Sequence, residues 1–369
     1  MPTDAAIRKI LSADRPCRLP AIVFALAVFL VGCASSASSP PATAAISGRQ
    51  QTQQVTLPAV ADAVVSPPIV VPAEEPGSPE LRVRATSLSV APASDGVGAF
   101  RIPCSYSHMA YDDPILLPGE PGKSHLHTFF GNSSTNSHST EKDLANATAG
   151  TCRGGIANRT SYWIPSMIDA ATHTALVPSD ALFYYKSGYN SIPRDRIQPI
   201  PAGLRMIAGK KPTASAGDPD WKWDRRERFH CDVNGEQGEV SETIPNCPAG
   251  SKLSLSLIFP NCWDGVSLDS PDHRSHMSFP ENGLCPASHP VAIPTVTLNI
   301  AYAVPAGSDT SRWRLSSDMY PESIPAGYSF HGDIWFNWNE DVMNTWLKNC
   351  VRAGNDCHAF LLGDGREVY

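Results

Sequence analysis

Two segments, KLSLSLIF at residues 252–259 and VTLNIAYAV at residues 296–304, decide the fold class of this chain. Both alternate apolar with polar or small residues and are bounded by Pro, Gly or Asn. Because side chains of a β-strand point alternately to the two faces of a sheet, this period predicts strands. LFYYKS at 182–187 and RWRLSSD at 312–318 predict further short strands, and VMNTWLKNCV at 342–351 is the best helix candidate.

Proline is frequent along the whole chain, with 34 prolines among 369 residues. Proline interrupts long helices and confines strands to short runs. The sequence therefore predicts a mainly β domain with a sandwich or jelly-roll-like core, long disulfide-stapled loops and a few short helices. Since loops carry function in such domains, the motifs between the strands are the first candidates for a site.

The first 32 residues have the composition of a signal peptide. A positive region comes first, formed by Arg8, Lys9, Arg15 and Arg18. The apolar run at 21–32 is too short to span a bilayer and has the length of a signal-peptide core. It ends in Leu-Val-Gly-Cys at 30–33, which looks like a bacterial lipobox. We expect an extracytoplasmic protein anchored through lipids on Cys33, in the outer membrane or at the cell surface. An ordinary secretory peptide with a chance cysteine is the alternative.

Residues 33–97 have the composition of a tether. They begin with Cys33, are rich in Ala, Ser, Pro and Val, and contain no aromatic residue. Such a segment buries little apolar area against the entropy of ordering, so we expect a flexible tether. Within it, LRVRATSLSV at 81–90 alternates well enough to form a short strand. Residues 98–369 have the length of one globular domain.

An even number of cysteines follows the tether. The eight residues are Cys104, Cys152, Cys231, Cys247, Cys262, Cys285, Cys350 and Cys357. In an oxidising compartment such a set predicts four disulfides. Cys231–Cys247 and Cys350–Cys357 are attractive local pairs, although spacing alone leaves the connectivity open. The alternative, a zinc site with cysteine ligands, finds no CxxC motif in the sequence.

The charge pattern speaks against nucleic acid as a partner. The formal net charge is −7, and no cluster of Lys and Arg appears along the chain. Proteins that bind nucleic acid use basic patches to neutralise phosphates. We therefore expect no nucleic-acid partner. The expected partners are the membrane, through the lipid anchor, and a polysaccharide.

Three short segments concentrate histidine and aspartate: GKSHLHTFFG at 122–131, DHRSHM at 272–277 and FHGDIWFNW at 330–338. Side chains at i and i+2 of a strand share a face, which brings together His125 with His127, and His331 with Asp333. Imidazole nitrogen suits zinc, copper, iron or nickel. The candidate ligands of a divalent metal ion are His125, His127, His276 and His331.

The same segments also suit acid–base catalysis without a metal. A glycoside hydrolase needs two carboxyl groups with separated pKa values, and a polysaccharide lyase needs a base beside a group that neutralises a uronic carboxylate. The candidate catalytic residues are His125, His127, His273, His276, His331, Asp333, Asp113, Asp264 and Asp272. Ordinary hydrogen-bonded histidines and turn-forming aspartates are the alternative for each of them.

Tryptophans near these segments offer a second hint of glycan binding. Trp263, Trp335 and Trp338 lie within or beside the motifs. An exposed tryptophan face stacks on a sugar ring, whereas partial burial in a core is the usual fate of this residue. We expect at least half of the tryptophans to lie in the core.

With these motifs assembled, the chain resembles the DUF1996 family, a secreted domain of unknown function. The motifs that carry the resemblance, in order, are CSYSHMAYDDPI, PGKSHLHTFFGN, NRTSYWIPSM, IPAGLRMIAG, FPNCWDG, LDSPDHRSHM, CPASHPVAIP, WRLSSD and HGDIWFNW. They cover residues 98–357. The resemblance implies a protein secreted by bacteria or fungi, whose fungal relatives often carry carbohydrate-binding or cell-wall modules. It supplies no reaction and no catalytic residues.

The sequence thus leaves two functions open. The first is an envelope-anchored enzyme that acts on a polysaccharide, as a hydrolase or a lyase, through the site rich in His and Asp. The second is a non-catalytic envelope protein that binds a glycan or a metal with the same residues. Substrate, metal and oligomeric state are not encoded in any motif.

Overall fold

The structure is a computed structural model that describes residues 77–188, 192–210, 223 and 225–369. The predicted signal peptide (1–32), Cys33 and most of the predicted tether lie outside these residues. Within the described part of the chain, no helix is long and apolar enough to cross a membrane.

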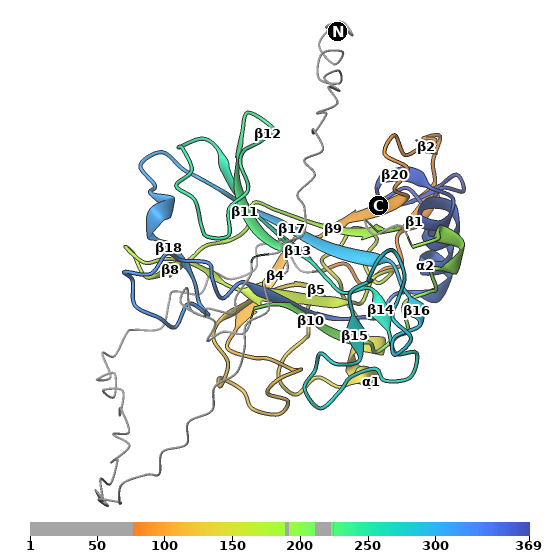
Figure 1. Ribbon diagram of the computed structural model, residues 1–369, viewed down its shortest axis with the longest axis horizontal. Coiled ribbons are helices and arrows are strands. Elements are labelled where there is room, and N and C mark those ends of the chain that lie inside the picture. The colour runs from red at the N-terminus through yellow and green to blue at the C-terminus, as the bar shows by residue number, and fades with distance from the viewer. Residues whose placement is uncertain (1–76, 189–191, 211–222, 224) are drawn as a thin grey trace, which may run out of the picture. The chain divides into compact units, whose positions relative to one another are not determined.

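The largest sheet has eight strands, and the two segments with the clearest alternation lie at its centre (Figure 1). Its order is β12 (Glu236–Gln237), β11 (Glu227–Val233), β13 (Lys252–Ile258), β17 (Thr295–Ala303), β9 (Asp180–Lys186), β3 (Ala99–Pro103), β20 (Asn355–Ala359) and β2 (Ala91–Pro92). β13 pairs antiparallel with β17, Leu255 opposite Ile300. The strands expected at 252–259, 296–304 and 182–187 are therefore confirmed.

A second sheet has five strands. Its order is β10 (Arg205–Gly209), β19 (His331–Trp335), β6 (Ser161–Pro165), β5 (His127–Gly131) and β4 (Tyr106–Ala110). β6 is central and pairs antiparallel with both β5 and β19. Phe129 and Asp333 both stand opposite Trp163, so these three side chains share one face of the sheet.

The two sheets pack face to face around the main core, as Figure 1 shows for β17 and β13 over β5 and β10. Tyr162 of β6 stacks on Phe183 of β9, with ring centroids 4.0 Å apart. Gly332 lets the layers approach closely, because a Cβ there would lie 2.8 Å from Leu257 and 3.2 Å from Leu298. A mainly β fold is thus confirmed, and the packed layers correspond to the sandwich alternative.

Smaller elements decorate this core. Two three-stranded sheets are formed by β15 (Met277–Ser278), β14 (Cys262–Trp263) and β16 (Val291–Ala292), and by β18 (Trp313–Leu315), β7 (Met167–Asp169) and β8 (Thr174–Ala175). The helices are α1 (Glu141–Ala145), α2 (Glu340–Trp346), the 3₁₀ turns Arg194–Arg196 and Thr310–Arg312, and the π-helix Leu347–Arg352. The helix expected at 342–351 is therefore present as α2 and the π-helical turn that follows it.

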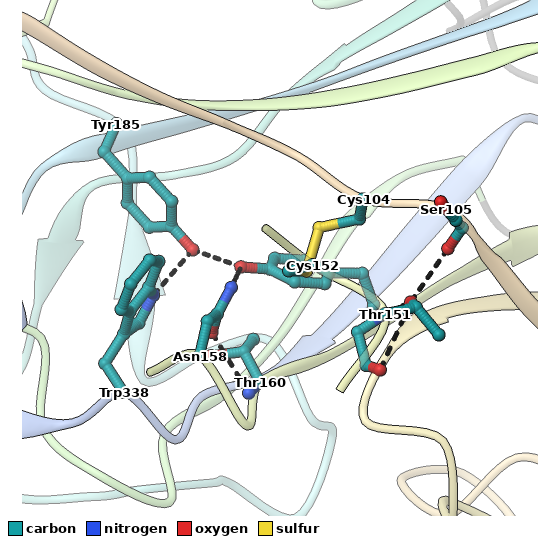
Figure 2. Close-up of a disulfide and its surroundings, with 10 residues drawn as sticks. Cys104, Ser105, Thr151, Cys152, Asn158, Thr160, Tyr185 and Trp338 are labelled. Carbon is teal, nitrogen blue, oxygen red and sulfur yellow. Dashed lines mark hydrogen bonds between the residues drawn. A yellow bond between two sulfur atoms is a disulfide. The ribbon is translucent and has the colours of Figure 1, made fainter. Parts of the chain in front are cut away.

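The structure contains four disulfides, and both attractive local pairs are among them. The bonds are Cys104–Cys152, Cys231–Cys247, Cys262–Cys285 and Cys350–Cys357. Figure 2 shows Cys104–Cys152 beside a buried hydrogen-bond network in which Tyr185 accepts from the indole of Trp338. The disulfides hold irregular segments against the sheets, as the sequence led us to expect.

The ordered part of the chain begins before residue 98, which differs from the predicted tether. β1 (Val83–Ala85) pairs with β21 (Arg366–Val368), and β2 pairs with β20. β1 falls within the alternating segment at 81–90. The short strand expected at 81–90 is thus present, whereas the sequence did not reveal the pairings of β1 and β2, because their partner strands lie more than 260 residues away.

Candidate metal centre

Three histidines from two of the three predicted segments meet on the outer face of the five-stranded sheet. His127 begins β5, His331 begins β19, and His125 lies in the loop just before β5. The ring centroids of His125 and His127 are 4.2 Å apart, and those of His125 and His331 are 5.1 Å apart. One nitrogen of each ring lies within 4.8 Å of the others. This spacing suits a single ion bound by all three imidazoles.

Main-chain carbonyls fix two of the three rings. Nδ1 of His127 lies 2.8 Å from the carbonyl oxygen of Asp112, and Nδ1 of His331 lies 2.7 Å from that of Ser329. Since a carbonyl only accepts, each Nδ1 carries the proton and each Nε2 presents a lone pair. The Nε2 atoms of all three histidines are buried and have no hydrogen-bond partner among the described residues. Such a tautomer, held from behind, is that of a metal-ligating histidine.

Burial keeps the three imidazoles neutral. It lowers the pKa of His127 to about 4 and that of His331 to about 4, the latter with a further contribution from His127. Burial, and then the neighbouring His127 and His331, also lower the pKa of His125 far below its usual value. At neutral pH the group therefore offers three uncharged nitrogen ligands.

Two buried carboxyl groups accompany the histidines. Asp333, two residues after His331 on the same face, is 0% exposed, and neither carboxyl oxygen has a hydrogen-bond partner among the described residues. Burial and the nearby Asp113 raise its pKa well above the usual range. Burial also raises the pKa of Asp113, although its carboxylate accepts from the N–H groups of Ile115 and Leu116. Burial thus favours the protonated form of Asp333 beside the histidines.

The DHRSHM segment covers the free edge of β10, where the charge of its Arg274 reaches His331 and Asp333. Nε2 of His276 donates to the carbonyl of Arg205, and its Nδ1 contacts the hydroxyl of Ser270. Nη1 of Arg274 donates to the carbonyl of Gly209. Because both ring nitrogens of His276 are engaged, this residue has no free nitrogen for the metal role that the sequence predicts.

The remaining predicted residues also have local partners. His273 bonds to Asp269, which pairs with Arg205. Asp272 is exposed and accepts from Arg274 N–H and Ser275 N–H, and Asp264 accepts from Val266 N–H and Ser267 N–H. These contacts correspond to the structural alternative, in which the aspartates form turns and the histidines are ordinarily hydrogen-bonded. Of the predicted tryptophans, Trp335 and Trp338 are buried, whereas Trp263 is only partly buried.

Sequence reasoning missed the groups that orient the rings. The carbonyls of Asp112 and Ser329 are main-chain atoms, and every residue carries one. No residue type marks which carbonyl will face a histidine. The sequence therefore indicates the ligands but contains no signal for their partners.

A family model with the description "Domain of unknown function (DUF1996)" matches residues 113–338. The matched region includes His125, His127 and His331, together with Asp113 and Asp333. No curated protein and no solved structure matches the chain.

Proposed function

The chain belongs to the DUF1996 family, and we propose that it is a metal-dependent enzyme that cleaves a polysaccharide of the cell envelope. The observation that carries the metal is the convergence of three neutral histidines whose Nε2 atoms are buried without a partner. Each buried polar atom left unpaired costs about 1–3 kcal/mol. A divalent transition metal bound to His125, His127 and His331 would satisfy all three at once.

The donor set fits an open catalytic site better than a closed structural one. Structural zinc sites use four protein ligands, commonly cysteines, and the eight cysteines of the domain are joined in disulfides. When bound, an ion with three histidine ligands keeps a position at which it acidifies water or polarises a substrate oxygen. His125 is the partly exposed member of the group, whereas His127 and His331 are buried.

Asp333 supplies a proton-transfer group in this proposal. Its carboxyl lies on the same sheet face as His331, and burial raises its pKa and so favours its neutral form. A neutral carboxylic acid donates a proton to the leaving oxygen in hydrolysis or elimination of a glycosidic bond. The charge of Asp113 also favours the protonated form of Asp333.

The envelope setting of the proposal rests on other features. Four disulfides favour an oxidising compartment. The lipobox-like sequence at Cys33 supports attachment to a membrane, and the polysaccharide substrate follows from the context that the family resemblance implies. The second candidate is a non-catalytic metal-binding envelope protein. The burial of His127 and His331 favours it, because a buried site gives a polymer little access.

Turnover on a panel of neutral and acidic envelope polysaccharides separates the two candidates. The metal-loaded protein is assayed for new reducing ends and for the ultraviolet absorbance of unsaturated products, which reports elimination. We expect cleavage by the wild type, its loss in His127→Ala, and its retention in His358→Ala, which alters an exposed histidine outside the group. Glycan or metal binding by the wild type without cleavage of any polymer would leave only the non-catalytic role.

A further inference from the structure

The loop between β18 and β19 is folded around one carboxylate. Asp318 is 9% exposed and accepts from the main-chain N–H groups of Leu315, at 3.0 Å, and Gly327, at 2.8 Å. The hydroxyl groups of Tyr320 and Ser329 donate to its other oxygen, each at 2.6 Å. One side chain thus ties together four points of the loop.

Ser329 links this carboxylate to the histidine group. The residue is fully buried, and its hydroxyl also contacts that of Ser317, at 2.6 Å. Its main-chain carbonyl is the acceptor for Nδ1 of His331, at 2.7 Å. The position of this carbonyl, and with it the orientation of the imidazole, therefore depends on the contacts of the Ser329 side chain.

The other oriented histidine has a related arrangement. The carbonyl of Asp112 accepts from His127, while the carboxylate of the same residue accepts from the N–H groups of Gly122, at 3.2 Å, and Ser137, at 3.1 Å. In both places a carboxylate holds a loop so that a main-chain carbonyl faces Nδ1 of a histidine. Two independent loops with the same arrangement indicate that the ring orientation matters to the site.

We propose that Asp318 is a positioning residue for His331, acting through the hydroxyl and carbonyl of Ser329. This inference rests on the proposed metal site. None of the hydrogen-bond partners of Asp318 is a histidine, so its effect is indirect. With the carbonyl held in place, the proton of His331 stays on Nδ1 and the lone pair of Nε2 faces the other two rings. Without it, the ring samples the other tautomer and other orientations.

The test compares Asp318→Asn and Ser329→Ala with Thr310→Val. Asn keeps the shape of Asp318 but weakens its hydrogen bonds, and Ala removes the hydroxyl of Ser329 while keeping its carbonyl. Thr310 is a matched control, because it is also fully buried and its hydroxyl binds main-chain atoms of Pro245 and Cys247 instead. All three variants lose comparable buried hydrogen bonds.

Two measurements are made on the full chain. Nitrogen NMR of the metal-free protein reports the tautomer of His331, and competition with a chelator reports the affinity for Zn²⁺. We expect a mixed tautomer and about 10- to 100-fold weaker zinc binding in Asp318→Asn and Ser329→Ala, with wild-type values in Thr310→Val. An unchanged tautomer and affinity in both site variants, or an equal loss in Thr310→Val, would overturn the assignment. If the wild type binds no zinc, the proposed function fails, and the tautomer measurement still decides the role of Asp318.

Discussion

Successive residues of β19 face opposite sides of the five-stranded sheet and have opposite surroundings. On the inner face, Ile334 packs in the main core, and polar atoms have partners: the hydroxyl of Tyr162 bonds to Tyr185 and Asn158. Figure 2 shows this network closed by Trp338. On the outer face, His331 and Asp333 are equally buried but present polar atoms without partners.

The two faces therefore differ in role: the inner face stabilises the domain, whereas the outer face holds the residues of the candidate site. A fold that leaves several polar atoms buried and unpaired loses stability with each of them. The inner face shows that the same strands satisfy buried polar groups where nothing else is required. The outer face thus carries an energetic cost that the proposed metal site would account for.

The largest effect is expected in the core between the two sheets, where β9 packs against the inner face of the five-stranded sheet. Phe183, fully buried between Tyr162 and Phe130, is the residue to truncate. Phe183→Ala should lower the free energy of unfolding by about 3–5 kcal/mol, because a large cavity opens in the core. Urea unfolding with the disulfides intact measures the loss. Zinc affinity of the folded fraction should stay at the wild-type value, and a large fall in it would show that the faces are not independent.

Removing a proposed ligand on the outer face should lower zinc affinity more than it lowers stability. His127→Ala should weaken zinc binding by at least about 100-fold, because the loss of a ligand exceeds the loss of an orienting partner. The free energy of unfolding of the metal-free protein should fall by less than in Phe183→Ala, since the lost side chain is smaller, its Nδ1 bonds only to the carbonyl of Asp112, and its Nε2 has no partner among the described residues. Chelator competition and urea unfolding give the two values. A loss of stability without a loss of affinity would assign His127 to the core instead.

Gly332 tests the boundary between the faces. Gly332→Ala places a Cβ against Leu257 and Leu298, and such overpacking costs about 1–3 kcal/mol. Because His331 and Asp333 flank this position, the shift of β19 should also weaken zinc binding. Ala208→Gly, at the paired position of β10, is the control that loosens the same layer without a clash. Equal zinc affinity in Gly332→Ala and wild type would mean that the site tolerates movement of β19.

The pH dependence of zinc binding follows from the histidines. Burial lowers the folded pKa of His127 and of His331 to about 4, below the ordinary value of 6.5, so the stability that their neutral rings contribute is complete above pH 6.5 and is lost as the pH falls through about 4. Zinc affinity should therefore stay nearly constant from about pH 7 to 5.5 and fall steeply near pH 4. Calorimetric titrations across this range test it. A decline that begins between pH 7 and 6 would indicate exposed, ordinary histidines.

The smallest effect is expected at Asp333. Its pKa is raised in the folded protein, so above pH 3.8 the unfolded chain loses this proton more readily than the folded one, and the residue costs stability. That cost disappears as the pH falls below 3.8, where both states hold the proton. Asp333→Asn removes the titration and should modestly raise the melting temperature of the metal-free protein at pH 7, with less gain at pH 4. A lower melting temperature at pH 7 would mean that the ionised carboxylate has a stabilising partner.

Much of the fold could be predicted from the sequence, because the main strands show a local alternation of apolar and polar residues. The strands at 252–259 and 296–304 are neighbouring interior strands of the large sheet, and Cys350 and Cys357 are joined as their spacing suggested. The strand predicted at 81–90 is present as β1, but its pairing with β21 could not be predicted, since that strand lies far away in the sequence. Long-range pairing leaves no local pattern.

Only part of the histidine group could be predicted from the sequence. Alternation places His331 and Asp333 on one face, and the structure keeps them there. Residue type alone did not separate His125, which joins the group, from His276, whose two nitrogens bind Arg205 and Ser270. That difference depends on which loop reaches the free edge of β10, a tertiary property.

The most direct test of the account is zinc or cobalt binding by the purified wild-type chain, followed by X-ray absorption of the loaded protein. The account predicts one ion per chain, bound by three imidazole nitrogens at about 2.0–2.1 Å, and its loss in a variant with alanine at His125, His127 and His331. Binding of less than about a tenth of an equivalent at saturating metal, or unchanged binding in that variant, would contradict it.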